Sequence, residues 1–256
     1  MKPAMLSFTF SDTLHKSKRP GWTHAICRAG RDYGDSFPEP WISDETIAAG
    51  VRRLDFDLAP TAANINGFAR LALQRARDGT QHACRLKAYW ENASMSLEDT
   101  CIRRFQARAG LARHTLEFGC EGFGRSGRFQ APAHSHMRED GHFVFRGSRC
   151  LVDGEQTSLK EFNFSLNNNL MLNCWGDEDS DTLLVAGRQE LSGYLCVAED
   201  RRDLIDGEVH AVRIILPGSH RGAVISARQV IFNWRRKIKS SVEGTLEVLY
   251  FEGASG

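Results

Sequence analysis

The sequence has almost no net charge, because 33 Lys and Arg residues are balanced by 32 Asp and Glu residues. A dedicated nucleic-acid binder normally carries a clustered positive excess, so this balance argues against that class. It still allows a local basic patch, such as Trp234-Arg235-Arg236-Lys237-Ile238-Lys239. The sequence also lacks an apolar run of about 18 residues, so no membrane-spanning helix is predicted.

Signals for export and for paired thiols are missing as well. The segment from Met1 to Phe10 lacks the charged-then-apolar plan of a signal peptide, which predicts synthesis in the cytoplasm. No CxxC pair occurs, which argues against a zinc ribbon or a thioredoxin-type motif. We interpret the cysteines as scattered small hydrophobic side chains in a reducing compartment. They are Cys27, Cys84, Cys101, Cys120, Cys150, Cys174 and Cys196.

Catalytic and cofactor motifs are absent too. There is no Gly-x-Ser-x-Gly elbow, and no cysteine stands at a helix start that would lower its pKa. The glycine-rich segment Gly122–Gly127 lacks the Gly-Lys-Ser/Thr ending of a phosphate-binding loop, and we interpret it as a flexible loop leaving a hairpin. The acidic turn Asp177-Glu178-Asp179 lacks the spaced oxygen ligands of a calcium loop. The sequence therefore predicts neither an enzyme nor a bound cofactor.

One histidine cluster keeps open the alternative of a small-ligand or metal-binding β protein. His134 and His136 stand two residues apart, with Asp140 and His142 nearby. In an extended segment the two imidazoles would point the same way and could share a metal. The flanking residues indicate a solvated loop with no further ligand set, so polar surface is the plainer interpretation.

One helix is predicted over residues 61–79. Thr61 can cap its start, apolar residues recur at helical spacing, and Gly79 provides a stop signal. These apolar residues are Ile65, Phe68, Ala69, Ala72 and Ala76. A shorter helix start is predicted at Ser43-Asp44-Glu45-Thr46.

From about residue 82 onward the dominant period is two, which predicts strands. The segment from Lys160 to Leu166 alternates strictly, with Phe162, Phe164 and Leu166 on one side. Asp153-Gly154 is a strong signal for a hairpin turn. Further strands are predicted at 6–10, 53–58, 84–88, 102–108, 114–120, 142–145, 150–152, 189–197, 208–216, 224–234 and 244–251.

These elements predict a mainly β fold, a two-sheet sandwich or open barrel with one flanking helix. The first 60 residues contain polar and proline-rich breakers at Lys16–Gly21 and Phe37–Pro40 and are predicted to form an irregular N-terminal arm. Residues 61–256 would form the β domain. Two long hairpins, at residues 100–124 and 226–253, echo each other faintly.

The tract Asn167-Asn168-Asn169 is unusual at the end of a strand. Asparagine tolerates left-handed backbone and can hydrogen-bond neighbouring backbone groups, so the tract predicts a specialised turn. An acidic turn and the strand carrying Gly193 follow it. From the residues alone, this segment is an elaborate loop of a β-sheet protein.

The order of these features resembles the tail-tube proteins of long-tailed phages. A hairpin ending in glycine precedes a strand pair over an Asp-Gly turn, then a Phe-x-Phe-x-Leu-x-Asn-Asn strand and a Gly-Arg stretch that leads to a second glycine and a closing hairpin. The likeness covers about residues 95–253. Its pieces are Cys101–Gly124, Phe143–Val152, Asp153-Gly154, Phe162–Leu170, Gly187-Arg188, Leu191-Ser192-Gly193 and Val224–Glu252.

The resemblance implies a tail-tube-type β fold, similar to the type VI secretion tube, that assembles as stacked hexameric rings. The implied location is the virion tail, and the implied partners are further copies of the chain and other tail proteins (tape measure, terminator, distal tail). DNA would pass through the tube as non-specific cargo. Distal-tail, terminator and baseplate-ring proteins on the same fold remain alternatives.

Candidate self-assembly residues lie in two places, the closing hairpin and the asparagine tract. We expect the basic hairpin residues on a stacking or outer surface or at the hairpin tip, because a tube lumen is expected to be mildly acidic. The candidates are Arg228, Trp234, Arg235, Arg236, Lys237, Asn167, Asn168 and Asn169.

Overall fold

The described part of the chain is almost entirely β-strand. The computed structural model describes residues 5–10, 22–25, 42–48, 51–58, 72–73, 84–89, 94–110, 116–130, 143–173, 183–217, 223–242 and 244–254. Within these ranges the chain is mainly β, as the period-two patterns predict, and the strand pairs named below are antiparallel. Ala72 and Leu73 are helical, and the rest of the helix predicted at 61–79 lies outside the described residues. None of the helical residues described belongs to a segment long and apolar enough to span a membrane.

The strands confirm most of the predicted positions and lengthen several of them. They are β1 (Met5–Phe10), β2 (Trp22–Ala25), β3 (Ile42–Ala48), β4 (Val51–Leu58), β5 (Cys84–Tyr89), β6 (Ser94–Ala109), β7 (Leu116–Gln130), β8 (Arg149–Val152), β9 (Glu155–Thr157), β10 (Leu159–Asn167), β11 (Leu170–Asn173), β12 (Leu183–Ala186), β13 (Glu190–Val197), β14 (His210–Leu216), β15 (Ala223–Ser240) and β16 (Gly244–Gly253). A short 3-10 helix, η1 (Arg202–Leu204), lies between β13 and β14.

The chain divides into two compact units. Unit 1 consists of Met1–Phe105, Phe118–Asp140 and Asn167–Gln189; unit 2 consists of Gln106–Glu117, Gly141–Leu166 and Glu190–Gly256.

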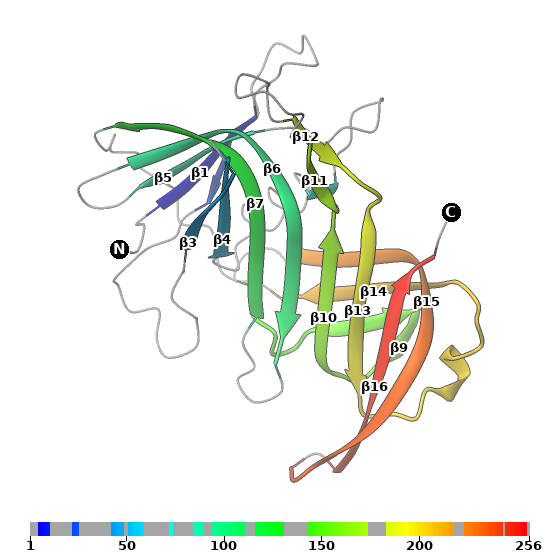
Figure 1. Cartoon of the computed structure of the whole chain (residues 1–256). Coiled ribbons are helices and arrows are strands. Elements are labelled where there is room, and N and C mark those ends of the chain that lie inside the picture. The colour runs from blue at the N-terminus through cyan, green and yellow to red at the C-terminus, as the bar shows by residue number, and fades with distance from the viewer. Residues whose placement is uncertain are drawn as a thin grey trace. The chain divides into compact units, whose positions relative to one another are not determined.

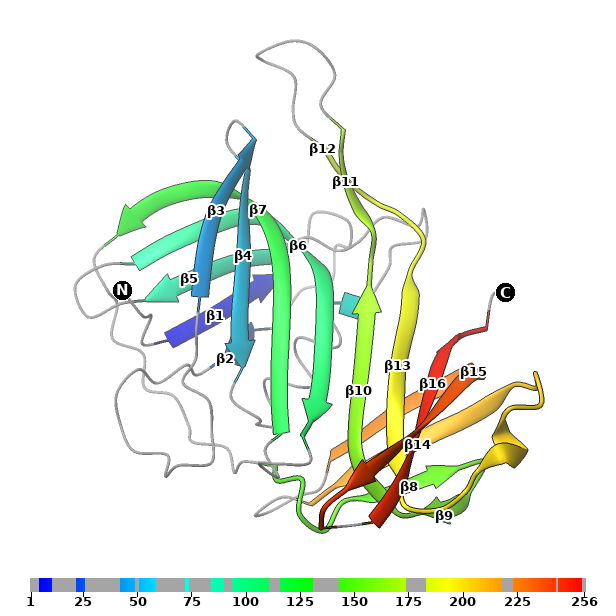
Figure 2. The ribbon, with the colours of Figure 1, turned by 60° about the horizontal axis from the view of Figure 1, so that its bottom comes forward.

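Unit 1 contains strands in the order β2-β1-β5-β6-β7-β4-β3, together with the β11–β12 pair (Figures 1 and 2). The predicted N-terminal arm supplies β1 to β4, and β1 pairs with β5 while β4 pairs with β7. Much of the first 60 residues therefore contributes paired strands to unit 1.

Two predictions in unit 1 were wrong. Residues 43–46, predicted as a helix start, belong to β3, because Ile42 pairs with Phe56 and Asp44 with Leu54 on β4. The glycine-rich segment 122–127, predicted as a flexible loop, belongs to β7 and pairs with β4, for example Arg125 with Val51. In both cases pairing with a strand distant in sequence overrides the local preference.

Unit 2 contains strands in the order β10-β13-β16-β15-β14-β8-β9. On β8, β10 and β14, buried side chains alternate with more exposed ones. On β14, His210, Val212, Ile214 and Leu216 are buried, whereas Arg213 between them is exposed. This is the alternation expected of a sheet with one face on a core and the other facing solvent.

Aromatic rings fill the core of unit 2. Phe145, Phe162, Phe164, Phe251 and Phe232 follow one another with ring centroids 5.0–5.9 Å apart. The predicted sharing of one face by Phe162, Phe164 and Leu166 is confirmed, because all three are buried. Tilted and edge-on aromatic pairs of this kind stabilise a core beyond their burial alone.

The hairpin turns of unit 2 use the predicted residues. Asp153 and Gly154 both have positive φ, 51° and 89°, and connect β8 to β9. Two left-handed residues in succession match the right-handed twist of the flanking strands. The predicted Asp-Gly turn is therefore confirmed.

A bulge interrupts the long β15–β16 hairpin. Phe232 pairs with Phe251 and Trp234 with Tyr250, so Asn233 is an extra residue on β15. A bulge bends its strand and increases the local twist. The hairpin is therefore divided into a proximal part attached to the sheet and a distal part beyond the bulge.

Candidate functional site

The distal part of the β15–β16 hairpin extends past the strands on either side of it (Figure 1). Pairing with β14 stops at Val230, and pairing with β13 stops at Glu247, whereas β15 and β16 stay paired to Ser240 and Gly244. Among the described residues, no strand pairs with the outer edge of β15 over residues 231–239. At about 3.3 Å per residue, this open edge is roughly 30 Å long.

The predicted basic tract divides between the two faces of this hairpin. Arg235 and Lys237 lie on the face that carries Glu247, and both have acidic partners within the chain. Arg235 Nη1 lies 2.6 Å from Glu247 Oε1 and 3.6 Å from Asp200 Oδ1, and Lys237 Nζ lies 3.4 Å from Asp200 Oδ2. These two predicted assembly residues therefore anchor the segment after β13 to the hairpin.

Trp234 and Arg236 lie on the opposite face, across from Tyr250 and Val248. Trp234 is 55% exposed and stacks on Tyr250 with ring centroids 4.8 Å apart. Arg236 is exposed, and no ion pair with another described residue is formed. At the tip of the hairpin, Val242 is 88% exposed.

An apolar cluster supports this second face. Cys196, Leu246 and Val248 are buried there, and the partly buried Tyr194, Ile238 and Tyr250 pack against them. The Tyr194 hydroxyl donates a short hydrogen bond to Glu161, and burial of the phenol together with this carboxylate raises the pKa of Tyr194. Trp234 therefore packs on Tyr250, which itself packs against this apolar cluster.

Arg228 lies where β15 changes register against β14. It is exposed, and its neighbour Gln229 has a φ of 60°. The Gln229 carbonyl accepts a hydrogen bond of 2.6 Å from the Ala254 N–H. The backbone at this point is therefore fixed, and the Arg228 side chain projects to solvent.

The asparagine tract forms a network inside unit 1. Asn168 is fully buried, and its amide nitrogen donates to the carbonyls of Ala72 (2.8 Å) and Ile102 (2.7 Å). Its Oδ1 accepts a hydrogen bond of 2.9 Å from Gln189, whose Nε2 also lies 3.1 Å from the Ala72 carbonyl. A side chain enclosed in this way joins segments of one subunit and offers nothing to a neighbouring copy.

Asn167 and Asn169 shape the turn beside it. Asn169 has a φ of 45°, its N–H donates to Asn167 Oδ1, and its side chain donates to the Arg188 carbonyl. The predicted left-handed backbone and asparagine-to-backbone hydrogen bonds are confirmed.

Gly187 and Gly193 stand where two backbones come too close for a side chain. A Cβ on Gly187 would lie 2.6 Å from the Asn169 carbonyl oxygen. A Cβ on Gly193 would overlap the Asn163 carbonyl and lie 2.6 Å from the ring of Phe251. Glycine is therefore needed at both positions so that the neighbouring backbone can pack this closely.

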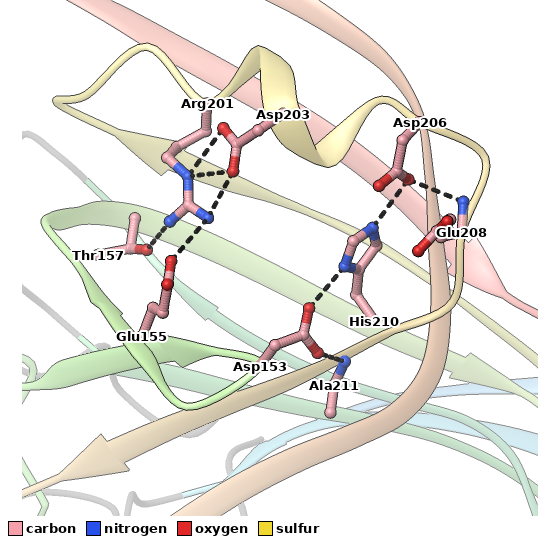
Figure 3. A network of polar contacts seen from close by, with 9 residues as sticks. All are labelled: Asp153, Glu155, Thr157, Arg201, Asp203, Asp206, Glu208, His210 and Ala211. Carbon is pink, nitrogen blue, oxygen red and sulfur yellow. Dashed lines mark hydrogen bonds and ion pairs between the residues drawn. The ribbon is translucent and has the colours of Figure 1, made fainter.

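A polar network joins the β13–β14 connection to the β8–β9 hairpin (Figure 3). Arg201, 13% exposed, donates to Thr157 Oγ1 at 2.8 Å and to both carboxylate oxygens of Asp203, and its Nη2 lies 3.7 Å from Glu155. Its backbone N–H donates to Glu247 Oε2 at 2.7 Å. The hydrogen bond from Arg201 lowers the pKa of Asp203.

His210 forms the other half of the network. Its Nδ1 lies 2.7 Å from Asp153 Oδ2 and its Nε2 lies 3.1 Å from Asp206 Oδ1, and the ring packs on Phe232. Burial by itself lowers the pKa of His210, but the hydrogen bonds and charges of Asp153 and Asp206 outweigh burial and raise it. Asp153 also accepts from the Ala211 N–H at 2.8 Å.

We call this network the clamp, because it joins the β13–β14 connection to the β8–β9 hairpin. Its histidine is not placed to act as a general base. Both imidazole nitrogens face carboxylates, so neither is free to take a proton from a nucleophile. In the described part of the chain, no group of three His, Cys, Asp or Glu side chains could hold a metal ion. Burial raises the pKa of the Cys150 thiol to about 12 and of the Cys196 thiol to about 11, which makes both poor nucleophiles.

Sequence reasoning missed the clamp, although one signal was present. His210 begins the alternation His210-x-Val212-x-Ile214, which places its imidazole on the buried face. Its carboxylate partners come from loops, whose positions depend on the tertiary fold. His134, His136 and His142 of the metal-binding alternative lie outside the described residues, so that alternative stays a prediction.

Comparison with models of known protein families gives no match, and comparison with curated protein sequences gives none either.

Proposed function

We propose that this protein is a structural subunit that assembles with copies of itself, as a tail-tube protein of two-sheet, open-barrel type does. The observation that carries the proposal is the distal β15–β16 hairpin with its open edge and exposed apolar residues. The sequence resemblance over residues 95–253 supplies the expected assembly, stacked hexameric rings around a DNA conduit in a virion tail.

The open edge favours pairing with another chain. Residues 231–239 present backbone donors and acceptors on the side away from β16, and unpaired strand edges are templates for an added strand. A protein that stays monomeric blunts such edges or covers them. This edge is long, and Ile231 and Ile238 lie along it.

Side chains on the same hairpin supply candidate contact points. Trp234 is a rigid, half-exposed aromatic residue, and interface hot spots are enriched in such residues. Val242 exposes a hydrophobic side chain at the tip, where solvent would favour a polar residue. A hairpin inserted into a different patch of the next copy makes a head-to-tail contact, and contacts of this kind close into rings or extend into filaments.

Negative-stain microscopy and light scattering over a concentration series test the proposal. We expect the wild-type chain to form rings or tubes, and Val242→Asp and Trp234→Ser to stay monomeric with an unchanged melting temperature. Val144→Asp is the matched control, because Val144 is also exposed, at 42%, and lies outside the hairpin.

A stable wild-type monomer at high concentration would contradict the tube assignment. Rings that never stack would favour a distal-tail, terminator or baseplate-ring protein instead. Loss of assembly in Val144→Asp to the same extent as in Val242→Asp would remove the hairpin from the interface.

A further inference from the structure

The solvent face of β8, β14 and β15 carries a row of arginines. Arg213 on β14 pairs with Leu151 on β8 and with Ser226 on β15. Arg149 lies two residues before Leu151, and Arg228 lies two residues after Ser226. Arg149 is therefore a diagonal neighbour of Arg213, about 7–8 Å away. Arg228 lies on the other side of Arg213, within the register shift between β14 and β15. Arg149 is displaced from Arg213 toward the C-terminal end of β14, and Arg228 is displaced toward its N-terminal end. The three arginines therefore form one oblique row across the three strands.

The row is exposed and lacks carboxylate partners. Arg149, Arg213 and Arg228 are all exposed, and no ion pair joins them to another described residue. The opposite face of the same strands is the core, with Cys150, Val152, Val212, Ile214 and Leu216 buried.

Uncharged side chains lie within the row, and two carboxylates flank it: Asp153, which is hydrogen-bonded to Ala211 and His210, and Glu252. Gln156 on β9, Ser226 and Val224 on β15 and Ile215 on β14 share its face by their registers. Glu252 on β16 is opposite Ile231, beyond Arg228, and forms no ion pair with the row. A row of three exposed guanidinium groups with no acidic side chain between them is complementary to a polyanion.

We propose that this face binds the phosphate backbone of nucleic acid through Arg149, Arg213 and Arg228. Arginines spaced in this way along a sheet face can each reach a different phosphate of one strand of duplex DNA. Guanidinium groups bind phosphate oxygens bidentately. Contacts to phosphate oxygens carry no sequence information, so we expect binding that is independent of sequence. This inference rests on the sheet of unit 2 alone and does not depend on the tube.

Fluorescence anisotropy with a short labelled DNA duplex tests the inference. It is measured on the full chain in the Val242→Asp background, so that assembly and DNA binding are separated. Three phosphate contacts predict that affinity falls about 40-fold between ~50 mM and ~200 mM salt. Each single change, Arg149→Gln, Arg213→Gln or Arg228→Gln, should reduce the salt slope by about one.

The control is the triple variant Arg188→Gln, Arg202→Gln, Lys239→Gln, which removes the same charge from exposed positions outside the row. We expect it to bind like the parent chain, while the triple variant of the row loses binding. Equal losses in the two triple variants, or no binding at low salt, would overturn the proposal. Tighter binding of poly-glutamate than of DNA would also overturn it and would identify an acidic protein surface as the partner.

Discussion

At the scale of single residues, Asn168 is a polar side chain that stabilises the interior of unit 1 through hydrogen bonds. It joins Ala72, Ile102 and Gln189, which are far apart in sequence, and it is fully buried. Buried amides are stable only when their donors and acceptors are paired. The hydrogen bonds of Asn168 therefore fix where the neighbouring segments of unit 1 can lie.

Replacing Asn168 with Ala should lower the free energy of unfolding by about 2–4 kcal/mol, because two backbone carbonyls lose a buried donor. Urea denaturation followed by circular dichroism measures the change. Asn167→Ala is the control and should cost about 1 kcal/mol or less, since it loses one local hydrogen bond. Equal costs for the two variants would show that the buried network contributes little.

The buried thiols give a second prediction at this scale. Cys101, Cys150 and Cys196 are buried, in line with the interpretation of the cysteines as small hydrophobic side chains. Because all three thiols are shielded from solvent, and burial also raises the pKa of Cys150 and Cys196, we expect no maleimide labelling of them in the native protein and full labelling in denaturant. Peptide mass spectrometry measures the pattern, and labelling of Cys150 in the native state would contradict it.

At the scale of elements, the packing of β13 depends on a residue with no side chain. Gly193→Ala would place a methyl group against the Asn163 carbonyl and the ring of Phe251. We expect a loss of about 1–3 kcal/mol in thermal or urea unfolding. Gly110→Ala is the matched control, because a Cβ there meets nothing within 4 Å, and its stability should stay unchanged.

The clamp between the β13–β14 connection and the β8–β9 turn should respond to pH. Asp153 and Asp206 face His210 directly, Asp203 and Arg201 lie nearby, and Phe232 covers the ring. A doubly protonated imidazole donates to both carboxylates, whereas a neutral one donates to only one. The folded-state pKa of His210 is raised, so its contribution is complete below about pH 6.5 and is lost as pH rises through the folded pKa.

The difference in free energy of unfolding between wild type and His210→Gln therefore should shrink by about 1 kcal/mol as pH rises from about 6 to above the folded pKa of His210. Chemical denaturation at a series of pH values measures it. A difference that stays constant with pH would show that the pKa of His210 is the same in the folded and unfolded states.

At the scale of the whole molecule, assembly should change the exposure of one edge and leave the core as it was. Hydrogen exchange of the β15 amides that face away from β16, over residues 231–239, should be fast in the Val242→Asp monomer and slow in assembled wild type. The amides of β14, which has a strand on both sides, should be slow in both. Fast exchange of the 231–239 edge in the assembled protein would place the interface elsewhere.

Local patterns predicted much of this fold. Strict alternation located β10 and β14, and Asp153-Gly154 located the turn between β8 and β9. Where a strand is polar or rich in glycine, as in β3 and β7, the local sequence indicates a strand only weakly. Pairing with the neighbouring strand then determines the strand conformation. The candidate site shows the same limit, because the partners of Asn168 and Arg235 come from distant segments that no local pattern specifies.

The bulge at Asn233 affects the direction in which the hairpin points, and it does not affect which side chains lie on each of its faces. Removing Asn233 keeps Phe232 opposite Phe251 and Trp234 opposite Tyr250, so each side chain stays on its own side. What changes is the bend, because the extra residue is what twists the strand away from its earlier course. In the assembly that we propose, a single inserted residue would therefore set the angle at which one subunit reaches the next, and with it the diameter and pitch, while the core of the subunit is preserved.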